Sequence, residues 1–211
     1  MLVAGLDEVG WGSAAGPLVS VVVVMKDADY LLIPKGVTDS KKLTHLRREA
    51  FFLQLCAAVT DKGIGVLEPE EIDRMTPKWA LQESYKRALD ELHVKPDKLI
   101  VDGTEWTNMV RCWKGPQIVV PKADLHHKEV SIASIIAKVI RDRAMMELAA
   151  RFKQKGLPDY GWAKNFGYLT PDHIRAIEKN GLLYGPDPEL YQHRRSYTSN
   201  LLGKARIYGC A

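Results

Sequence analysis

The opening seventeen residues restrict the fold and chemistry of this chain more than any other stretch. A short apolar segment ends in two adjacent acids, Asp7 and Glu8, and a glycine-rich loop, Gly10–Pro17, follows directly. Carboxylates are ligands that divalent cations prefer, and glycine lets backbone amides come close to an anionic ligand. The β-branched run Leu18–Met25 then predicts a second strand. These features indicate a metal-ion site beside a loop that could bind a phosphate group, a combination typical of enzymes that act on phosphodiesters.

The rest of the chain predicts an α/β domain with a mixed central sheet flanked by helices. Strands are expected at residues 2–6, 18–25, 63–67, 98–102 and 117–120, and helices at 44–59, 69–74, 78–93, 128–155 and 171–180. Strands come first and then alternate with helices, which is the order of elements in such a domain. Because no repeat, low-complexity tract or linker interrupts the chain, we predict a single domain over residues 1–211, with a C-terminal helical extension from about residue 157.

The charge balance permits a nucleic-acid partner without requiring one. Lys and Arg number 30 against 26 Asp and Glu, which gives a net charge of +4. After Glu189 the chain has no acid, while basic residues remain at Arg194, Arg195, Lys204 and Arg206. Such a tail fits either a segment that lies along phosphates or a solvated basic end.

Cysteine usage and the length of apolar runs indicate the cellular compartment. The three cysteines form no C-x-x-C pair, which argues against a zinc site or a disulfide framework and favours a reducing compartment. The sequence shows no secretory signal, and its longest apolar run, Leu18–Met25, is far too short to span a bilayer. We therefore expect a cytoplasmic protein with no membrane partner; we also expect a monomer.

Four acids lie at the ends of predicted strands. Asp7 and Glu8 end the first strand, Asp102 ends a later one, and Asp124 follows another. Acids at strand ends in an α/β sheet converge on one edge. Such a cluster repels itself unless cations are bound, and two divalent ions roughly 4 Å apart could clamp both oxygens of an in-line phosphoryl displacement. Any one of these acids could instead simply begin a turn. Taken as a set, they predict a two-metal site.

Motifs spread along nearly the whole chain form a specific series. They are Gly5–Pro17, Asp39–Thr44, Ile100–Gly103, Lys122–Asp124, Ser131–Met145, Tyr160–Gly161, Gly167–Thr170, His173 and His193–Tyr197. In content and order this series resembles the type 2 ribonuclease H family, ribonuclease HII. The resemblance implies a ribonuclease H-like fold and a Mg²⁺- or Mn²⁺-dependent endonuclease, with two ions per site during catalysis. Asp7, Glu8, Asp102 and Asp124 match the four catalytic acids of the family, whose implied role is metal coordination.

The same resemblance implies a substrate and its products. The substrate would be RNA within a duplex with DNA, including single ribonucleotides embedded in DNA, as met in ribonucleotide excision repair and DNA replication. Cleavage would fall on the 5′ side of the ribonucleotide and leave 3′-hydroxyl and 5′-phosphate ends. The C-terminal extension from about residue 157 to residue 211 would contact this substrate.

Discrimination of RNA from DNA requires contact with the 2′-hydroxyl, and the loop of Gly10, Trp11 and Gly12 is the candidate for it. In the family the matching loop performs this role, usually with a basic residue between the glycines, where this chain has Trp11. Reading by the backbone would tolerate Trp11, whose ring could also stack on a sugar or base. Tyr168 matches the family tyrosine that recognises the junction between the ribonucleotide and the following DNA. A core tyrosine under a loop is the alternative for Tyr168.

Further contacts with the nucleic-acid backbone are expected from two segments. Lys41 and Lys42, at the start of a predicted helix, can hold phosphates. Ser134, Lys138 and Arg141 fall at i, i+4 and i+7 of the long predicted helix and so share one face, which could carry the backbone. Solvated lysines and an ordinary amphipathic helix are the alternatives.

Other functions fit parts of the sequence. The glycine loop loosely matches a dinucleotide-binding loop, but that function requires a helix where Leu18–Met25 predicts a strand. Ribonuclease HIII, a sibling that cleaves long hybrids, shares the opening motif, yet typically carries an extra N-terminal domain, whereas this chain starts at the catalytic strand and keeps the Gly167–Tyr168 motif. A catalytically weak nucleic-acid-binding relative is a third alternative, which the intact acids oppose. The tail Leu201–Ala211 lacks a sliding-clamp motif, so we expect no clamp binding through it.

Overall fold

The computed structural model describes residues 1–37, 43–184, 190 and 192–195. The strands are β1 (Val3–Val9), β2 (Leu18–Met25), β3 (Asp61–Leu67), β4 (Lys98–Asp102) and β5 (Gln117–Val120). The helices are α1 (His45–Ala58), α2 (Pro69–Asp73), α3 (Pro77–Asp90), α4 (Glu105–Asn108), α5 (Lys128–Gln154), α6 (Trp162–Asn165) and α7 (Pro171–Asn180), with 3₁₀ turns at Asp27–Leu31 and Ala123–Leu125. Within the described ranges, no helix is long and apolar enough to cross a membrane.

The chain divides into two compact units. The first comprises Met1–Val9, Val19–Val66 and Leu81–Arg141, and the second comprises Gly10–Leu18, Leu67–Ala80 and Asp142–Ala211. The last segment of the second unit begins within α5, ahead of the extension expected from about residue 157. A single domain over the whole chain stays a prediction.

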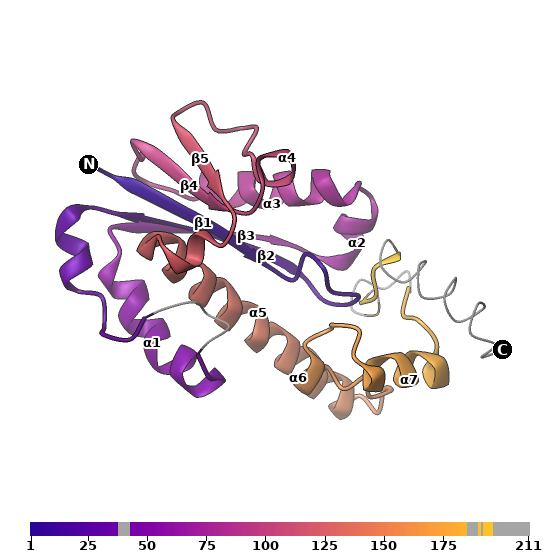
Figure 1. Cartoon of the computed structure of the whole chain (residues 1–211). Coiled ribbons are helices and arrows are strands. Elements are labelled where there is room, and N and C mark those ends of the chain that lie inside the picture. Colours follow the sequence, from indigo (N-terminus) through magenta and orange to yellow (C-terminus); the bar gives the residue numbers. More distant parts are fainter. Residues whose placement is uncertain (38–42, 185–189, 191, 196–211) are drawn as a thin grey trace. The chain divides into compact units, whose positions relative to one another are not determined.

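A five-stranded sheet in the order β3-β2-β1-β4-β5 is the frame of the first unit (Figure 1). β1 pairs antiparallel with β2 and parallel with β4, and β4 pairs parallel with β5. The expected mixed sheet flanked by helices is therefore confirmed. Because β1, β4 and β5 are parallel, their carboxyl ends share one edge, which is where the predicted acids stand.

The two faces of this sheet are covered by different helices (Figure 1). The odd-numbered residues of β2 pack in one buried cluster with apolar residues of α1 and α5. On the other face, the Ser20 hydroxyl lies 2.7 Å from the hydroxyl of Ser84 on α3. Residues paired across an antiparallel ladder share a face, so the pairings of Asp7 with Val21 and of Glu8 with Ser20 send the adjacent acids to opposite faces.

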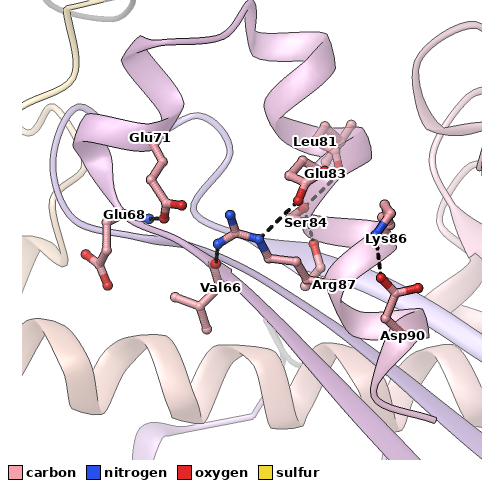
Figure 2. Close-up of polar contacts among 10 residues, drawn as sticks. Val66, Glu68, Glu71, Leu81, Glu83, Ser84, Lys86, Arg87 and Asp90 are labelled. Atoms are coloured by element: carbon pink, nitrogen blue, oxygen red, sulfur yellow. Dashed lines mark hydrogen bonds and ion pairs between the residues drawn. The ribbon is translucent and has the colours of Figure 1, made fainter.

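Polar contacts fasten α3 to the sheet (Figure 2). Arg87 donates from Nη1 to the carbonyl oxygen of Val66 on β3 at 2.7 Å, and from Nε to Glu83 at 3.2 Å. Lys86 and Asp90 form an exposed pair one turn apart, at 2.5 Å (Figure 2). Exposed pairs of this kind add little stability, so of these contacts the Arg87 hydrogen bond to Val66 is the one that ties α3 to β3.

An aromatic cluster forms the core of the second unit. Trp162 is buried, stacks on Tyr160 with ring centroids 5.0 Å apart, and meets Phe152 edge-on at 4.9 Å. α7 follows, and the Thr170 hydroxyl caps it by accepting a hydrogen bond from the His173 amide. The cluster and the cap together hold the segment between α6 and α7, which carries Tyr168.

All ten predicted elements are found, and four of them have the predicted bounds at both ends. β2, β4, β5 and α7 begin and end at the expected residues. β1 runs to Val9 instead of ending at Leu6, because both acids continue the ladder with β2. The sequence does not predict α4 and α6, because a four-residue helix is too short to show an apolar period of 3.6 residues.

Candidate active site

Asp7 lies near the end of β1, on the face covered by α5, and is only 8% exposed. Its carboxylate accepts hydrogen bonds from the Ser134 hydroxyl on α5 and from the Glu8 amide, the latter at 2.8 Å. Burial raises the pKa of Asp7 well above its ordinary value, and the negative charges of Glu8 and Asp102 raise it further. Asp7 is thus a desolvated carboxyl with like charges beside it, a condition that a bound cation would relieve.

Glu8 points to the opposite face, where α3 supplies its partner. The Tyr85 hydroxyl donates to Glu8 Oε2 at 2.6 Å. Tyr85 is fully buried, and burial together with the charge of Glu8 raises its pKa well above the ordinary value of 10.0. The phenol therefore stays protonated at neutral pH and remains a donor to the carboxylate.

Asp102 ends β4, and its Oδ1 accepts a hydrogen bond from the Ala123 amide at 2.7 Å. Ala123 and Asp124 are buried in the 3₁₀ turn that follows β5. The residue bonded to Asp102 is thus the immediate neighbour of Asp124. The negative charges of Glu8 and Asp102 both act on Asp7, and Asp124 lies on the turn that is bonded to Asp102. Convergence of all four acids on one metal site stays a prediction.

These acids suit a divalent cation by their chemistry. They offer hard oxygen donors of the kind that Mg²⁺ and Mn²⁺ prefer, and the partners of Asp7, Glu8 and Asp102 orient them. In the part of the chain that the structure describes, no three or more His, Cys, Asp or Glu side chains form a ready-made metal cage. The fit therefore rests on donor type, burial and mutual repulsion.

The glycine-rich loop belongs to the second unit and is held from within by Arg194. Arg194 is fully buried, and its guanidinium donates to the carbonyl oxygens of Gly10, at 2.6 Å, and Gly16, at 2.7 and 2.9 Å. The Arg194 amide also donates to the Ala14 carbonyl at 2.8 Å. Arg194 is therefore neither a solvated tail residue nor placed to lie along phosphates, and both interpretations from the sequence are wrong for it.

Residues within this loop have different surroundings. Gly10 is buried with a φ of 94°, a conformation that favours glycine, whereas Gly12 is exposed and has no atom within 4 Å of an added Cβ. Trp11 is partly buried against the cluster around Leu18, and its Nε1 donates to the Pro77 carbonyl at 3.3 Å. The Trp11 ring thus contacts protein on one side, and its contact with a sugar or base stays a prediction.

Tyr168 lies beside the same loop. The carbonyl of the preceding Gly167 accepts from the amides of Ala14, at 2.9 Å, and Ala15, at 3.2 Å. Gly167 has a φ of 80°, and a Cβ there would lie 2.3 Å from the Ala15 carbonyl oxygen, so the close approach requires glycine. Tyr168 itself is 36% exposed. It is therefore not the core tyrosine of the alternative interpretation, because more than a third of the residue is exposed.

The predicted polar face of α5 is largely buried. Ser134 and Arg141 are 2% and 0% exposed, and Lys138 is half-buried. These three residues do not form an exposed stripe, although Ser134 reaches the candidate site through Asp7. Direct contact of Ser134 or Lys138 with phosphates stays a prediction. Lys41, Lys42 and the tail 201–211 lie outside the described residues.

Sequence reasoning misses two buried polar residues at this site, Tyr85 and Asn108. Asn108, on α4, donates from Nδ2 to the Tyr85 hydroxyl oxygen at 2.9 Å. A tyrosine within an amphipathic helix is typical of a core position, and an asparagine in a loop is typical of a turn. Only the contact between α3 and β1, two elements far apart in the sequence, distinguishes Tyr85 and Asn108 from such ordinary residues. No local sequence signal therefore identifies them as part of the site.

Comparison with known proteins gives a consistent result. The family model described as Ribonuclease HII matches residues 4–199. Ribonuclease HII from Carboxydothermus hydrogenoformans is 42% identical over 196 residues, which cover 93% of this chain and 77% of that protein. The ribonuclease H2 structure from Pyrococcus horikoshii OT3 matches with a TM-score of 0.77 and 31% identity over 99% of both chains. Bst-RNase HIII, solved in complex with Mn²⁺, shares the fold, with a TM-score of 0.69 at 21% identity over 98% of this chain and 71% of that one.

Proposed function

The chain belongs to the ribonuclease HII family of endoribonucleases, and we propose that it hydrolyses the phosphodiester on the 5′ side of a ribonucleotide. The substrates are RNA–DNA hybrids and single ribonucleotides embedded in DNA, and the products carry 3′-hydroxyl and 5′-phosphate ends. The setting is ribonucleotide excision repair and DNA replication. The observation that carries this proposal is the buried Asp7 carboxyl at the carboxyl edge of the sheet, whose pKa is raised by burial and by the negative charges of Glu8 and Asp102.

The reaction depends on Mg²⁺ or Mn²⁺, with two ions per site. Asp7, Glu8, Asp102 and Asp124 would hold the ions, and the Mn²⁺ complex of Bst-RNase HIII, which has the same fold, supports this. When bound, such ions supply positive charge that stabilises the phosphoryl oxygens during an in-line displacement. Before any ion binds, Ser134 and Tyr85 already orient the carboxylates of Asp7 and Glu8.

Substrate contacts come from the glycine loop and from Tyr168. We assign the ribose 2′-hydroxyl to the backbone of Gly10, Trp11 and Gly12, because the open space at Gly12 lets a ligand approach the main chain. The exposed Tyr168 ring packs on the sugar that follows the ribonucleotide. Phosphates of the same duplex are assigned to Lys41, Lys42, Ser134 and Lys138.

The decisive experiment is cleavage of an end-labelled DNA duplex that holds one ribonucleotide, with Mg²⁺ or Mn²⁺, by the wild type and by Asp7→Asn. A cut on the 5′ side that the variant loses supports the proposal. Cleavage of a long RNA–DNA hybrid alone would instead indicate the substrate range of a ribonuclease HIII. Inactivity on both substrates, with retained duplex binding, would indicate a binding protein and overturn the proposal.

The role of Tyr168 can be tested separately from the chemistry. Tyr168→Ala should reduce cleavage at a single ribonucleotide about 10-fold or more, and cleavage of a long hybrid less, because a stacking contact is typically worth about 1–3 kcal/mol. Tyr168→Phe keeps the ring and is the matched control. Equal losses on both substrates would exclude recognition of the junction by Tyr168.

A further inference from the structure

A buried chain of polar contacts runs from Glu8 toward Asp102, and sequence reasoning assigns it no role. The Tyr85 hydroxyl donates to Glu8 Oε2 at 2.6 Å, and Asn108 Nδ2 donates to the Tyr85 oxygen at 2.9 Å. Asn108 Oδ1 in turn accepts from the Thr104 amide at 3.1 Å. Tyr85 and Asn108 are 0% and 5% exposed, so water cannot easily replace these hydrogen bonds.

The backbone determines the direction of every hydrogen bond in this chain. The Thr104 amide can only donate, so Asn108 must turn Oδ1 toward it and Nδ2 toward Tyr85. Because Nδ2 donates, the Tyr85 oxygen is the acceptor there, and the hydroxyl proton is directed to Glu8. Tyr85 is therefore held as a donor to Glu8, because the other contacts in this chain offer its hydroxyl proton no competing acceptor.

The same asparagine supports the turn after Asp102. Gly103 has a φ of 123°, and a Cβ there would lie only 2.2 Å from Asn108 Oδ1. The Gly103 amide donates to the carbonyl oxygen of Val120, on β5, at 3.2 Å. Asn108 is thus packed against Gly103, the residue that follows Asp102, while its amide nitrogen donates to Tyr85, which in turn donates to Glu8.

We propose that Tyr85 and Asn108 are positioning residues that hold the Glu8 carboxylate in place relative to Asp102 for cation binding. Like charges on Asp7, Glu8 and Asp102 drive the carboxylates apart, and the Tyr85 hydrogen bond opposes rotation of Glu8. This inference rests on the proposed function, because it requires those acids to bind a cation. Hydrogen-bond partners of metal ligands typically contribute about 10- to 100-fold in affinity or activity.

The first test is Tyr85→Phe, which keeps the buried ring and removes the hydroxyl. Isothermal titration calorimetry of the substrate-free protein should show Mn²⁺ affinity weakened about 10-fold or more. In steady-state cleavage, kcat should fall while KM for the duplex stays unchanged, because the duplex-binding groups are intact. Tyr160→Phe is the matched control: Tyr160 is also buried and donates to the Gly181 carbonyl at 2.8 Å, in the second unit, so its loss should leave Mn²⁺ affinity unchanged.

The second test is Asn108→Ala, alone and combined with Tyr85→Phe. The single variant should weaken Mn²⁺ binding less than Tyr85→Phe, because the hydroxyl can still reach Glu8. The double variant should bind Mn²⁺ no more weakly than Tyr85→Phe, because Asn108 acts through Tyr85. Additive losses of affinity would overturn the proposal. Circular dichroism checks that each variant folds. If Tyr85→Phe does not fold, a Mn²⁺ affinity of Asn108→Ala equal to that of the wild type overturns the proposal.

Failure of this inference and failure of the proposed function look different. If the wild type neither binds Mn²⁺ nor cleaves either duplex, both the proposed function and the positioning role are overturned. If the wild type does both, and Tyr85→Phe equals it in Mn²⁺ affinity and kcat, only the positioning role of Tyr85 and Asn108 is lost.

Discussion

The guanidinium of Arg194 donates two hydrogen bonds to the carbonyl oxygen of Gly16, from Nε at 2.9 Å and from Nη2 at 2.7 Å. A third bond, from Nη1, reaches the Gly10 carbonyl at 2.6 Å. One buried side chain thus gathers carbonyls from both ends of the glycine loop. With these carbonyl oxygens turned toward Arg194, the loop keeps a single backbone shape, which is what reading of a ribose by the main chain would need.

Arg194→Met should therefore destabilise the protein strongly. The variant keeps much of the side-chain volume but removes both Arg194 donors from the Gly16 carbonyl, which costs about 1–3 kcal/mol. The Gly10 carbonyl also loses its bond to Arg194 but keeps the amide and hydroxyl of Ser13 as donors. Urea unfolding measures this loss. Arg175→Met is the control, since Arg175 is exposed and pairs with the exposed Asp172, and should change stability by less than about 0.5 kcal/mol. Equal effects of both variants would show that the Arg194 bonds contribute little.

Gly167→Ala should disturb the contact between Tyr168 and the glycine loop. An added Cβ would lie 2.3 Å from the Ala15 carbonyl oxygen, and the φ of 80° is itself unfavourable for alanine. Gly156→Ala is the control, because Gly156 has a similar φ of 64° with no atom near the added Cβ. The control should cost about 1–2 kcal/mol of unfolding free energy from backbone strain alone, and Gly167→Ala clearly more. Equal losses would mean that the loop shifts to accommodate the methyl group.

Local pattern predicts much of this fold, and it fails where contacts are remote in sequence. The run Leu18–Met25 and the helix Pro171–Asn180 carry their own boundaries, in Pro17 and Gly181, and both are found as expected. The acids are predicted to converge because parallel strands must bring their ends together. Arg194 is misjudged, since the composition of a tail says nothing about a carbonyl more than 170 residues away.

The hydrogen-bond partners of the acids are the least predictable part of the site. Nothing near Tyr85 in the sequence distinguishes a hydroxyl that serves Glu8 from any core tyrosine. The sequence places Ser134 on the expected helix as a candidate phosphate contact, but it does not predict the hydrogen bond that its hydroxyl donates to Asp7. Side-chain direction depends on strand register, and the pairings of β1 with β2 that determine it appear only in the folded chain.

Stability should fall at acid pH because of His193. Burial, with the nearby His173, lowers the pKa of His193 to about 3, against about 6.5 in the unfolded chain. The unfolded state therefore binds the proton first, so this contribution to stability is complete above pH 6.5 and is lost as the pH falls toward 3, by about 1.4 kcal/mol per pH unit. Urea unfolding at pH 7 and pH 5 measures the slope. His193→Gln should flatten it, whereas His126→Gln, at an exposed position, should not; an unchanged slope in His193→Gln would exclude His193 as its source.

Asp7→Asn should stabilise the metal-free protein at neutral pH even though it abolishes cleavage. The folded pKa of Asp7 is raised above the unfolded value, so its contribution to stability is complete in acid and is lost as the pH rises through the folded pKa. At neutral pH the raised pKa of Asp7 is therefore a cost to folding, which asparagine removes while still accepting from Ser134. Thermal melting in EDTA should show a higher midpoint for Asp7→Asn, and added Mg²⁺ should raise the wild-type midpoint far more than that of the variant.

Asp90→Asn, at an exposed position on α3, is the control for a lost charge in this experiment and should not shift the midpoint appreciably with or without Mg²⁺. A lower midpoint for Asp7→Asn in EDTA would mean that the carboxylate is not repelled in the folded protein, and that the acids are held without need of a cation.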